Sequence, residues 1–273
     1  MPLSTEAVLV LLQSVAAEVI TPRFRTLSES QIDEKRPGDL VTVADHEAED
    51  LITRALLEAY PDAVVLGEEA YHGERELMPR FRAAFHGFTV DPVDGTKNFV
   101  HGSRDHAMMI GEVKGGEAVR GWIWQPQHSR AYVAELGSGA WRNGERVVRP
   151  ATPPRSEWRG VTSRRKWLGR ALADDLRELE LTWVSCGIDY PHLVEGDADY
   201  VLYGRANPWD HVPGGLILTE AGGYLGTLDG HPYRPADDHA VEAAVPRGLL
   251  AAADRATYDA LQPLVSPQGR PGS

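Results

Sequence analysis

The stretch DPVDGTKNF, residues 91–99, follows the short apolar run at residues 88–90 and places two carboxylates three residues apart. Pro92 fixes its own backbone angle and biases Asp91 toward an extended conformation. An extended segment projects alternate groups to one side. Both acids and the intervening carbonyl of Val93 can therefore converge on one point.

The second part of the same stretch is suited to binding an anion. Gly95 permits a sharp turn, after which residues 96–99 can begin a helix. The first backbone N–H groups of a helix are unpaired and attract an anion such as phosphate. The stretch thus combines hard oxygen ligands with an anion-binding turn, which is what metal-assisted phosphoryl chemistry needs.

The composition of the chain restricts its partners. With 273 residues, 42% of them apolar and 25% charged, the chain can bury a substantial core in one large domain or two joined halves. A net charge of −12 argues against a nucleic-acid partner bound by a basic face and against an anionic membrane surface. The negative net charge would also repel a phosphate substrate unless cations near the site reverse the local electrostatic potential. This favours a site that holds divalent metal ions.

The chain carries one cysteine, Cys186, which excludes an intramolecular disulfide and fits a reducing compartment. Residues 1–17 have apolar spacing but no basic start, and they include Glu6, so we expect no signal peptide. No apolar run approaches the roughly 20 residues of a membrane span. We expect a cytoplasmic protein.

The pattern of the first half alternates helix and strand. Apolar residues recur at helical spacing over residues 4–27 and predict an amphipathic helix. A polar stretch, residues 28–38, precedes an expected strand at 40–43. Asp45 is then expected to be the N-cap of a helix that Pro61 closes.

A short apolar strand at residues 63–66 leads directly to the acidic pair Glu68 and Glu69. From residue 105 to 148 the pattern becomes an antiparallel meander, because turn signals recur at short intervals and include the hairpin signal Asn143-Gly144.

Residues 150–154 mark the boundary between two halves, and the second half again alternates. Interleaved strands and helices together with a meander predict layered α/β sheets. The expected strands are residues 161–163, 181–185, 200–203, 224–225 and 240–245, and the expected helices are 167–179, 190–195, 209–222 and 255–265.

The acids at the ends of these elements each have a simple structural explanation. The glutamate pair at 68–69 can lie in a solvated loop, and Asp91 and Asp94 can form turns. Asp210 and Asp45 can each cap a helix. Taken together, however, four segments end a strand or start a helix with an acid, and in layered α/β proteins such ends gather at one sheet edge.

Packing these acids together without metal is unfavourable. One like-charge pair at about 4 Å costs roughly 4 kcal/mol at an effective dielectric of about 20. Two or three Mg²⁺ ions would convert that repulsion into coordination. An all-oxygen ligand set suits Mg²⁺, Mn²⁺ or Ca²⁺ rather than Zn²⁺.

Other chemistry finds less support. The ten histidines form no HExxH-like pair, and the chain has no GxGxxG, GxxxxGK[ST] or GxSxG motif. Cys186 is most simply a small core residue. The basic cluster at residues 162–166 is either a solvated loop or a contact for the phosphate or the leaving group.

Several motifs, taken together, resemble the inositol monophosphatase family. They are DLVTVAD at residues 39–45, GEE at 67–69, DPVDGTKNFVHG at 91–102 and WDHVPGG at 209–215, continuing to EAGG at 220–223. Their order and spacing match from about residue 5 to 265. The resemblance implies a sugar-phosphatase fold, a five-layer αβαβα sandwich, and a homodimer. It also implies Mg²⁺-dependent, often lithium-sensitive, hydrolysis of phosphate monoesters.

The same resemblance implies one phosphatase unit, residues 1–265. Its N-terminal half would be about residues 1–149 and its C-terminal half about 155–265. A disordered tail at 266–273 would follow.

The resemblance also implies roles for individual residues. Glu68, Asp91 and the Val93 carbonyl would hold a first metal, Asp91, Asp94 and Asp210 a second, and a third ion would use Glu68. Asp45 and Thr96 would orient and deprotonate the attacking water. The remaining implied substrate contacts are Asp94, the Gly95 and Thr96 amides, Gly187, Ile188, Asp189 and Asp210.

Departures from the family pattern leave the substrate open. Lys97 replaces a common second threonine, and Pro213 replaces a small residue in what we expect to be the first turn of its helix. Where inositol-specific members carry a glutamate, this chain has Tyr203-Gly204-Arg205, so no acid is available there for sugar hydroxyls. Asp189 also replaces a small residue.

We therefore expect a phosphatase of small phosphorylated substrates, with inositol 1-phosphate as the default. The alternatives within the superfamily are a histidinol-phosphate, fructose-bisphosphate or 3′-phosphonucleotide phosphatase. The alternative of another class is a non-catalytic paralogue that binds metal or phosphate.

Overall fold

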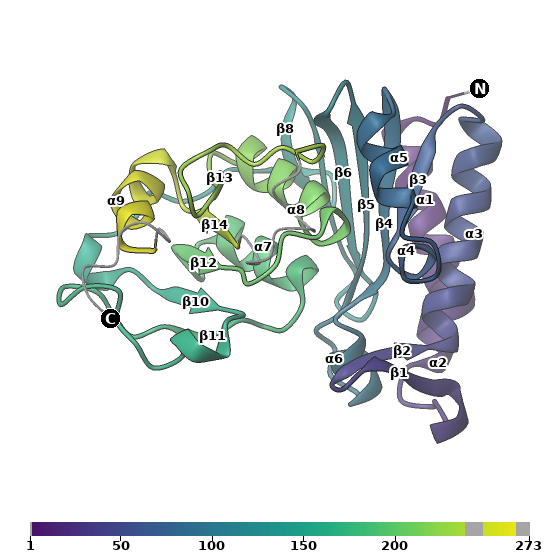
Figure 1. The fold of residues 1–273 in the computed structure, drawn as a ribbon, viewed down its shortest axis with the longest axis horizontal. Coiled ribbons are helices and arrows are strands. Elements are labelled where there is room, and N and C mark those ends of the chain that lie inside the picture. The colour runs from purple at the N-terminus through teal and green to yellow at the C-terminus, as the bar shows by residue number, and fades with distance from the viewer. Residues whose placement is uncertain (1, 238–247, 266–273) are drawn as a thin grey trace.

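The computed structural model describes residues 2–237 and 248–265. In these residues two large β-sheets and three groups of helices are stacked in five layers (Figure 1). The layered αβαβα sandwich expected from the sequence is confirmed. The strand expected at residues 240–245 and the tail at 266–273 lie outside the described residues.

The first sheet has seven strands in the order β3-β4-β5-β6-β7-β8-β9. Only β3 and β4 run parallel; every later pair is antiparallel, which confirms the predicted meander. The strands are β3 (Val64–Gly67), β4 (His86–Asp94), β5 (Ala107–Lys114), β6 (Glu117–Gln125), β7 (Arg130–Glu135), β8 (Gly139–Arg142) and β9 (Glu145–Val147).

Helices α1 (Thr5–Val15) and α3 (Val43–Ala59) cover the outer face of this sheet. The chain continues from α1 through a π-turn (Ala16–Ile20) and α2 (Thr21–Arg23). The resulting segment, Thr5–Arg23, is long and apolar enough by composition to cross a membrane, so the expectation that no apolar run approaches that length was wrong. Its buried residues pack against α3 and the sheet.

The second sheet has five strands in the order β11-β10-β12-β14-β13. Helices α7 (Cys186–Glu195) and α8 (Pro208–Glu220) lie between the two sheets, and α9 (Arg255–Val265) covers the far side (Figure 1). The strands are β10 (Gly160–Thr162), β11 (Glu180–Leu181), β12 (Tyr200–Leu202), β13 (Tyr224–Thr227) and β14 (Leu249–Ala252).

The remaining short elements lie at the edges of the layers. They are a 3₁₀ turn (Glu29–Gln31), the two-stranded sheet β1 (Ile32–Arg36) and β2 (Asp39–Thr42), α4 (Glu68–Gly73), α5 (Leu77–Ala83), α6 (Thr96–Val100) and two further 3₁₀ turns (Arg155–Glu157 and Arg165–Trp167).

Two predictions for the first half were wrong. The first helix ends at Arg23 rather than residue 27. In addition, the polar stretch 28–38, to which no element was assigned, contains β1, which pairs antiparallel with β2. Asp45 is not the N-cap of α3. Thr42 is the N-cap, and Asp45 is the N3 residue of a capping box that bonds back to the Thr42 amide.

Three predictions for the second half were also wrong. Residues 167–179 form no helix, because Gly169 takes a left-handed conformation and its N–H bonds to the Leu179 carbonyl across a loop. The strand expected at 181–185 is reduced to β11. Helix α7 begins at Cys186 rather than 190.

Helices α7 and α8 each contain a proline, and the expectation that such a proline lies in the first turn does not explain them. Pro213 is the sixth residue of α8 and so lies beyond the first turn where we placed it. In α7, Pro191 cannot donate to the Gly187 carbonyl, and the Gln125 side-chain amide donates to that carbonyl instead at 2.8 Å. A side chain of the first sheet thus replaces the hydrogen bond that the proline removes.

Two glycines on neighbouring strands allow α8 to pack closely on the first sheet. Gly111 in β5 and Gly121 in β6 are register partners. A Cβ at Gly111 would lie 2.5 Å from Val212, and a Cβ at Gly121 would lie 2.8 Å from the Pro213 carbonyl oxygen. The start of α8, which carries Asp210, therefore lies against bare backbone.

We predict that Gly121→Ala destabilises the protein by about 1–3 kcal/mol, since the added methyl group meets backbone atoms that cannot rotate away. The matched control is Gly73→Ala, because a Cβ at Gly73 meets nothing within 4 Å. Urea denaturation of both variants measures the difference. Equal midpoints for the two variants would contradict this account of how α8 is seated.

Candidate active site

Three carboxylates from the two halves of the chain meet between the sheets. Asp91 and Asp94 lie at the end of β4, and Asp210 lies in the first turn of α8. One carboxylate oxygen from each lies within 4.8 Å of the others. Asp91 and Asp94 are buried, and Asp91 Oδ1 has no hydrogen-bond partner among the described residues.

The backbone of β4 explains why two acids of one strand face the same point. Asp91 pairs with Met109 and Asp94 with Ala107, so the register shifts between the two acids. Asp91 and Asp94 are three residues apart on β4, whereas their partners are two residues apart on β5. This extra residue is typical of a β-bulge, and it turns both acidic side chains to the same side of the strand. Gly95 then adopts a left-handed conformation with φ of 83° and begins α6.

Asp94 is held by the second half of the chain. Its Oδ2 accepts hydrogen bonds from the Ser185 hydroxyl and, at 2.6 Å, from the Gly187 amide at the start of α7. Burial raises the pKa of Asp94 to about 6, although these hydrogen bonds oppose the rise. The oxygen Oδ1 remains for another partner.

Burial also raises the pKa of Asp91, and the negative charges of Glu68, Asp94 and Asp210 raise it further. The pKa of Asp210 rises for the same reasons: burial first, then Glu68 and Asp94. The acids predicted as ligands therefore repel one another in this pocket, as the sequence argument required.

Asp45 and Thr96 form a linked pair beside this cluster. Asp45 Oδ2 accepts from the Thr42 amide and hydroxyl, and Asp45 Oδ1 accepts from the Thr96 hydroxyl at 3.0 Å. Burial raises the pKa of Asp45 to about 7. The Thr96 hydroxyl also lies 2.9 Å from the Val93 carbonyl oxygen, so its single proton has two alternative acceptors.

Glu68 and Glu69 begin α4 at the edge of the cluster. The Lys35 ammonium group on β1 donates to Glu68 at 2.7 Å and to Glu69 at 2.8 Å. Beneath them, the Glu49 carboxylate accepts the backbone N–H groups of Glu69 and Ala70. Burial raises the pKa of Glu49 to about 7. A lysine from the hairpin thus offsets part of the negative charge.

The residue before α8 holds Asp210. The Asn207 amide donates to Asp210 Oδ2 at 3.0 Å. His211, Cys186 and Asp210 also bring one potential ligand atom each to within 4.8 Å of the others. Both His211 nitrogens are already hydrogen-bonded, however, at 3.0 Å to the Tyr190 hydroxyl and at 3.0 Å to the Arg205 carbonyl.

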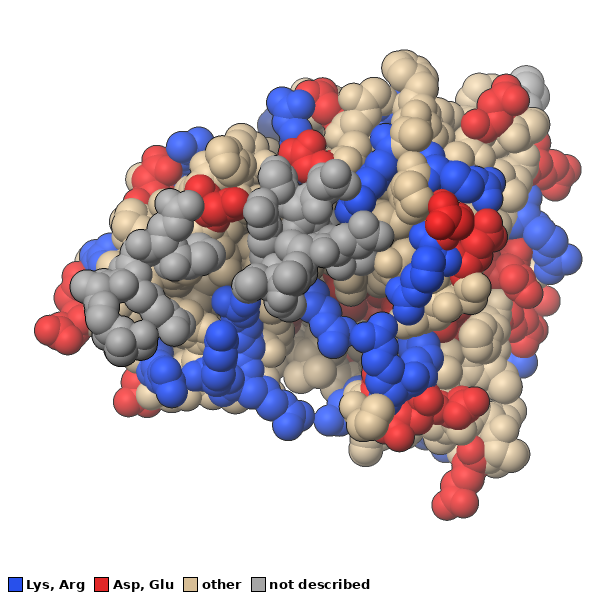
Figure 2. Space-filling model, viewed as in Figure 1, with Lys and Arg blue, Asp and Glu red and all other residues tan. Residues whose placement is uncertain are grey.

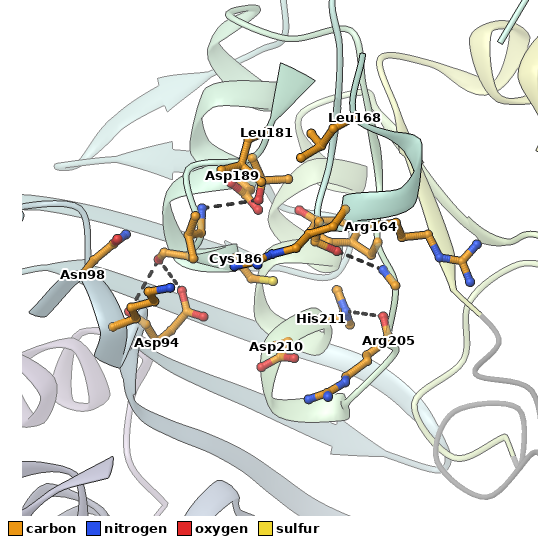
Figure 3. A pocket seen from close by; sticks show the side chains of 18 residues that line it. Asp94, Asn98, Arg164, Leu168, Leu181, Cys186, Asp189, Arg205, Asp210 and His211 are labelled. Carbon is orange, nitrogen blue, oxygen red and sulfur yellow. Dashed lines mark hydrogen bonds between the residues drawn. The ribbon is translucent and has the colours of Figure 1, made fainter. Parts of the chain in front are cut away.

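A pocket of about 990 Å³ extends from Asp94 and Asp210 to the loops that follow β10 and β12 (Figure 3). Asp189 lines it and is buried, with one oxygen accepting from the Trp183 amide. Burial, with the nearby charge of Asp94, raises the pKa of Asp189. Four residues predicted to contact substrate do not line the pocket: Gly95, Thr96, Gly187 and Ile188. The Gly187 amide is bonded to Asp94, and Ile188 is buried.

Cys186 was expected to be a small core residue, but it lines this pocket and is only partly buried. Sequence reasoning also missed the functions of Lys35 and Ser185, which reach the cluster from distant segments. The Thr42–Asp45 pair did have a local signal, since a threonine followed three residues later by an acid is the pattern of a capping box.

The donor set fits divalent cations. Oxygens of Asp91, Asp94 and Asp210 converge, the buried Asp91 Oδ1 has no hydrogen-bond partner in the described part of the chain, and Glu68 is close enough to raise the pKa of Asp91. Carboxylate oxygens with this net negative charge suit Mg²⁺ or Mn²⁺.

The family model, the sequence relatives and the solved structures that match this chain all indicate the same family. The model of the "Inositol monophosphatase family" matches residues 3–263. Inositol-1-monophosphatase of Bacillus subtilis is 31% identical over 220 residues, which are 77% of this chain and 80% of that protein. Fructose-1,6-bisphosphatase/inositol-1-monophosphatase of Aquifex aeolicus is 29% identical over 232 residues, which are 81% and 84% of the two chains. The solved IMPase structure of Thermotoga maritima matches with a TM-score of 0.76 and 25% identity, covering 94% of each chain.

We predict that, in a metal chelator, the unfolding free energy rises as the pH falls from 8 to 5. The folded-state pKa values of Asp45 and Asp94, about 7 and about 6, lie above the ordinary aspartate value. Their protonation therefore stabilises the folded protein at low pH, and this stability is lost as the pH rises through 6–7. For Asp94 the gain is on the order of 1 kcal/mol between pH 8 and 5 and about 3 kcal/mol once the pH falls below the ordinary aspartate pKa.

Urea denaturation in EDTA at several pH values measures this dependence. Below about pH 4 the unfolded carboxylates also take up protons, so the gain should stop. Asp94→Asn is the matched variant, because removing one titrating group should flatten the profile. A wild-type protein that is most stable at pH 8 in EDTA would contradict the predicted repulsion.

Proposed function

The chain belongs to the inositol monophosphatase family, a family of phosphoric monoester hydrolases, and on that premise we propose that it hydrolyses a small phosphate monoester with Mg²⁺ as cofactor. The observation that supports this most directly is the convergence of Asp91, Asp94 and Asp210, with a buried carboxylate oxygen that no described group satisfies. Hydrolysis by water needs such a set of hard ligands beside a proton acceptor and an anion site.

We propose that Glu68, Asp91 and the Val93 carbonyl hold one cation and that Asp91, Asp94 and Asp210 hold a second, with a third at Glu68. Mn²⁺ is the expected substitute. When bound, such ions lower the pKa of a coordinated water and neutralise charge on phosphoryl oxygens.

In this proposal Thr96 and Asp45 supply the proton acceptor. The Thr96 hydroxyl can donate to Asp45 Oδ1 while its lone pairs accept a hydrogen bond from the attacking water. The proton then passes from water to Thr96 and from Thr96 to Asp45. The capping box holds the other oxygen of Asp45, so the carboxylate cannot rotate away.

Phosphate binding is assigned to the turn that follows the two acids. The Gly95 and Thr96 amides begin α6, where backbone N–H groups are available to an anion. Cys186 is unsuited to a competing role as nucleophile. Burial and the nearby charges of Asp210 and Asp94 raise the pKa of its thiol, which keeps it protonated.

Inositol 1-phosphate remains the default substrate. Histidinol phosphate, fructose bisphosphate and 3′-phosphonucleotides are the alternatives, because Lys97 and Arg205 replace family residues and Arg205 stands where an acid for sugar hydroxyls is absent. The name of the Aquifex relative, which joins both activities, is consistent with that breadth. We also propose a cytoplasmic homodimer that lithium inhibits and that uses neither nucleic acid nor membrane.

A phosphate-release screen tests the reaction class. We expect the purified protein to release phosphate from at least one of these esters with Mg²⁺, and not in EDTA. Inositol 1-phosphate ranking far below the other esters would remove the default substrate but retain the reaction. No release from any ester at excess Mg²⁺ would instead favour a non-catalytic paralogue that binds metal or phosphate.

We predict that Asp94→Asn lowers kcat by about 100-fold or more, because it removes a charged ligand. The fold should be retained, because the amide oxygen can still accept from Ser185 and Gly187. Asp62→Asn, at an exposed acid, is the matched control. Steady-state kinetics and a thermal melt of both variants decide: unchanged kcat in Asp94→Asn would refute the assigned role.

A further inference from the structure

The pocket is strongly asymmetric in charge. Its three acids, Asp94, Asp189 and Asp210, belong to the end described above. The other charged groups that line it are all cationic: Lys97, Arg164, Arg165 and Arg205. Figure 3 shows Asp94 across the pocket from Arg164 and Arg205. Figure 2 shows Lys and Arg side chains gathered on the same face, between the parts that Figure 1 labels β11 and α6.

These cations stand out in a chain of net charge −12. Within residues 2–237 and 248–265, the Lys97, Arg165 and Arg205 side chains make no ion pair. All three are exposed at the pocket, and no acid in the described part of the chain contacts any of them directly, although the charge of Arg205 lowers the pKa of Asp210. Cations without protein partners in a concave site are available to an anionic ligand.

The two loops that carry the arginines are joined by a hydrogen bond from a backbone amide to a serine hydroxyl, and one of them is held further by a bond to a threonine hydroxyl. β10 and β12 run parallel, with Thr162 opposite Leu202, so the loops that follow them leave the sheet side by side. The Gly204 amide donates to Ser163 Oγ at 2.9 Å, and the Arg164 amide donates to Thr162 Oγ1 at 3.0 Å.

Close packing between the loops sets the position of one arginine. A Cβ at Gly204 would lie 3.2 Å from Arg164 Cγ, so the arginine stem lies against bare backbone. On the other loop, the Arg205 carbonyl accepts from His211 Nε2, which ties that residue to α8. Both segments are therefore fixed relative to Asp210.

From this arrangement we propose that the outer end of the pocket is a second anion subsite, selecting phosphomonoesters whose leaving group carries another phosphate or carboxylate. The proposal rests on the proposed function, because it places the hydrolysed phosphate at Asp94 and Asp210. Guanidinium groups suit this task, since they bind phosphate and carboxylate in a bidentate manner. At about 990 Å³ the pocket has room for a leaving group larger than the phosphate itself.

The pocket wall also carries apolar groups. Leu181 and Val184 are 51% and 42% exposed and line the pocket together with Leu168. An aliphatic surface beside cations accommodates the ring of a nucleotide as well as the carbon face of a sugar. The test must therefore include both classes of leaving group.

Matched substrate pairs provide the test. Fructose 1,6-bisphosphate is compared with fructose 1-phosphate, and adenosine 3′,5′-bisphosphate with adenosine 3′-phosphate. For at least one pair we expect kcat/KM of the bisphosphate to exceed that of the monophosphate by about ten-fold or more at low salt. The preference should shrink as salt is raised, because exposed charges are screened.

Arg165→Gln tests the subsite itself. We expect it to reduce the bisphosphate preference by about ten-fold, mainly through KM, and Arg165→Lys to restore part of it. Lys166→Gln is the matched control, since Lys166 is an adjacent exposed cation that does not line the pocket. Equal rates within both substrate pairs, or the same effect from Arg165→Gln and Lys166→Gln, would overturn the proposal.

A binding measurement separates this inference from the proposed reaction. Adenosine 5′-phosphate and fructose 6-phosphate, the products that retain the second anion, are titrated in EDTA and followed by phosphorus NMR. We expect the dissociation constant of at least one product to rise several-fold in Arg165→Gln and to stay the same in Lys166→Gln. If no ester is hydrolysed, the proposed function fails and this titration alone decides the subsite. Identical titrations of the wild type and Arg165→Gln would overturn the subsite.

Discussion

The structure depends on keeping several carboxylates close together in a buried space where they repel one another. Burial and mutual charge raise the pKa of Asp91 and of Asp210, and burial raises that of Asp94. A flexible chain would relieve this by moving the groups apart. The surrounding hydrogen bonds prevent that movement: Ser185 and Gly187 hold Asp94, and Asn207 holds Asp210. The repulsion among the carboxylates is thus retained in the folded protein. A bound cation would relieve it, so the repulsion favours cation binding.

The layered fold supplies the rigidity that this requires. Helix α8 lies between the two sheets, and its start rests on the paired glycines Gly111 and Gly121, so Asp210 cannot retreat from β4 without lifting a helix off a sheet. On the other side, the bulge in β4 and the left-handed Gly95 fix where Asp91 and Asp94 point. Each half contributes acids that the other half positions. The site therefore forms only when both halves are packed together.

Sequence patterns within a short segment correctly predicted the structures that depend on interactions within that segment. The meander from 105 to 148 carries its own turn signals, and the acids with their bracketing proline and glycine lie within one short stretch, so both could be inferred from sequence. The N-cap assigned to Asp45 was a local error, because the Thr42–Asp45 capping box could be read from sequence. Other failures were long-range or depended on one backbone angle. Gly169 turns residues 167–179 into a loop. The Lys35 contact with Glu68 joins residues 33 positions apart, and the Ser185 contact with Asp94 joins residues 91 apart. No pattern in a single segment predicts such contacts.

The two ends of the pocket follow different constraints. At the inner end, the ligands must be acids at fixed positions, because cation binding and proton transfer permit few alternatives. At the outer end, the Thr162 and Ser163 hydroxyls hold the loops after β10 and β12, so the arginine side chains of these loops can change without disturbing the acids. In this chain those loops carry Arg164, Arg165 and Arg205. Arg205 belongs to the segment where we expected inositol-specific members of the family to carry a glutamate. The acidic motif therefore predicts the reaction class, whereas substrate selectivity depends on the charged side chains outside that motif.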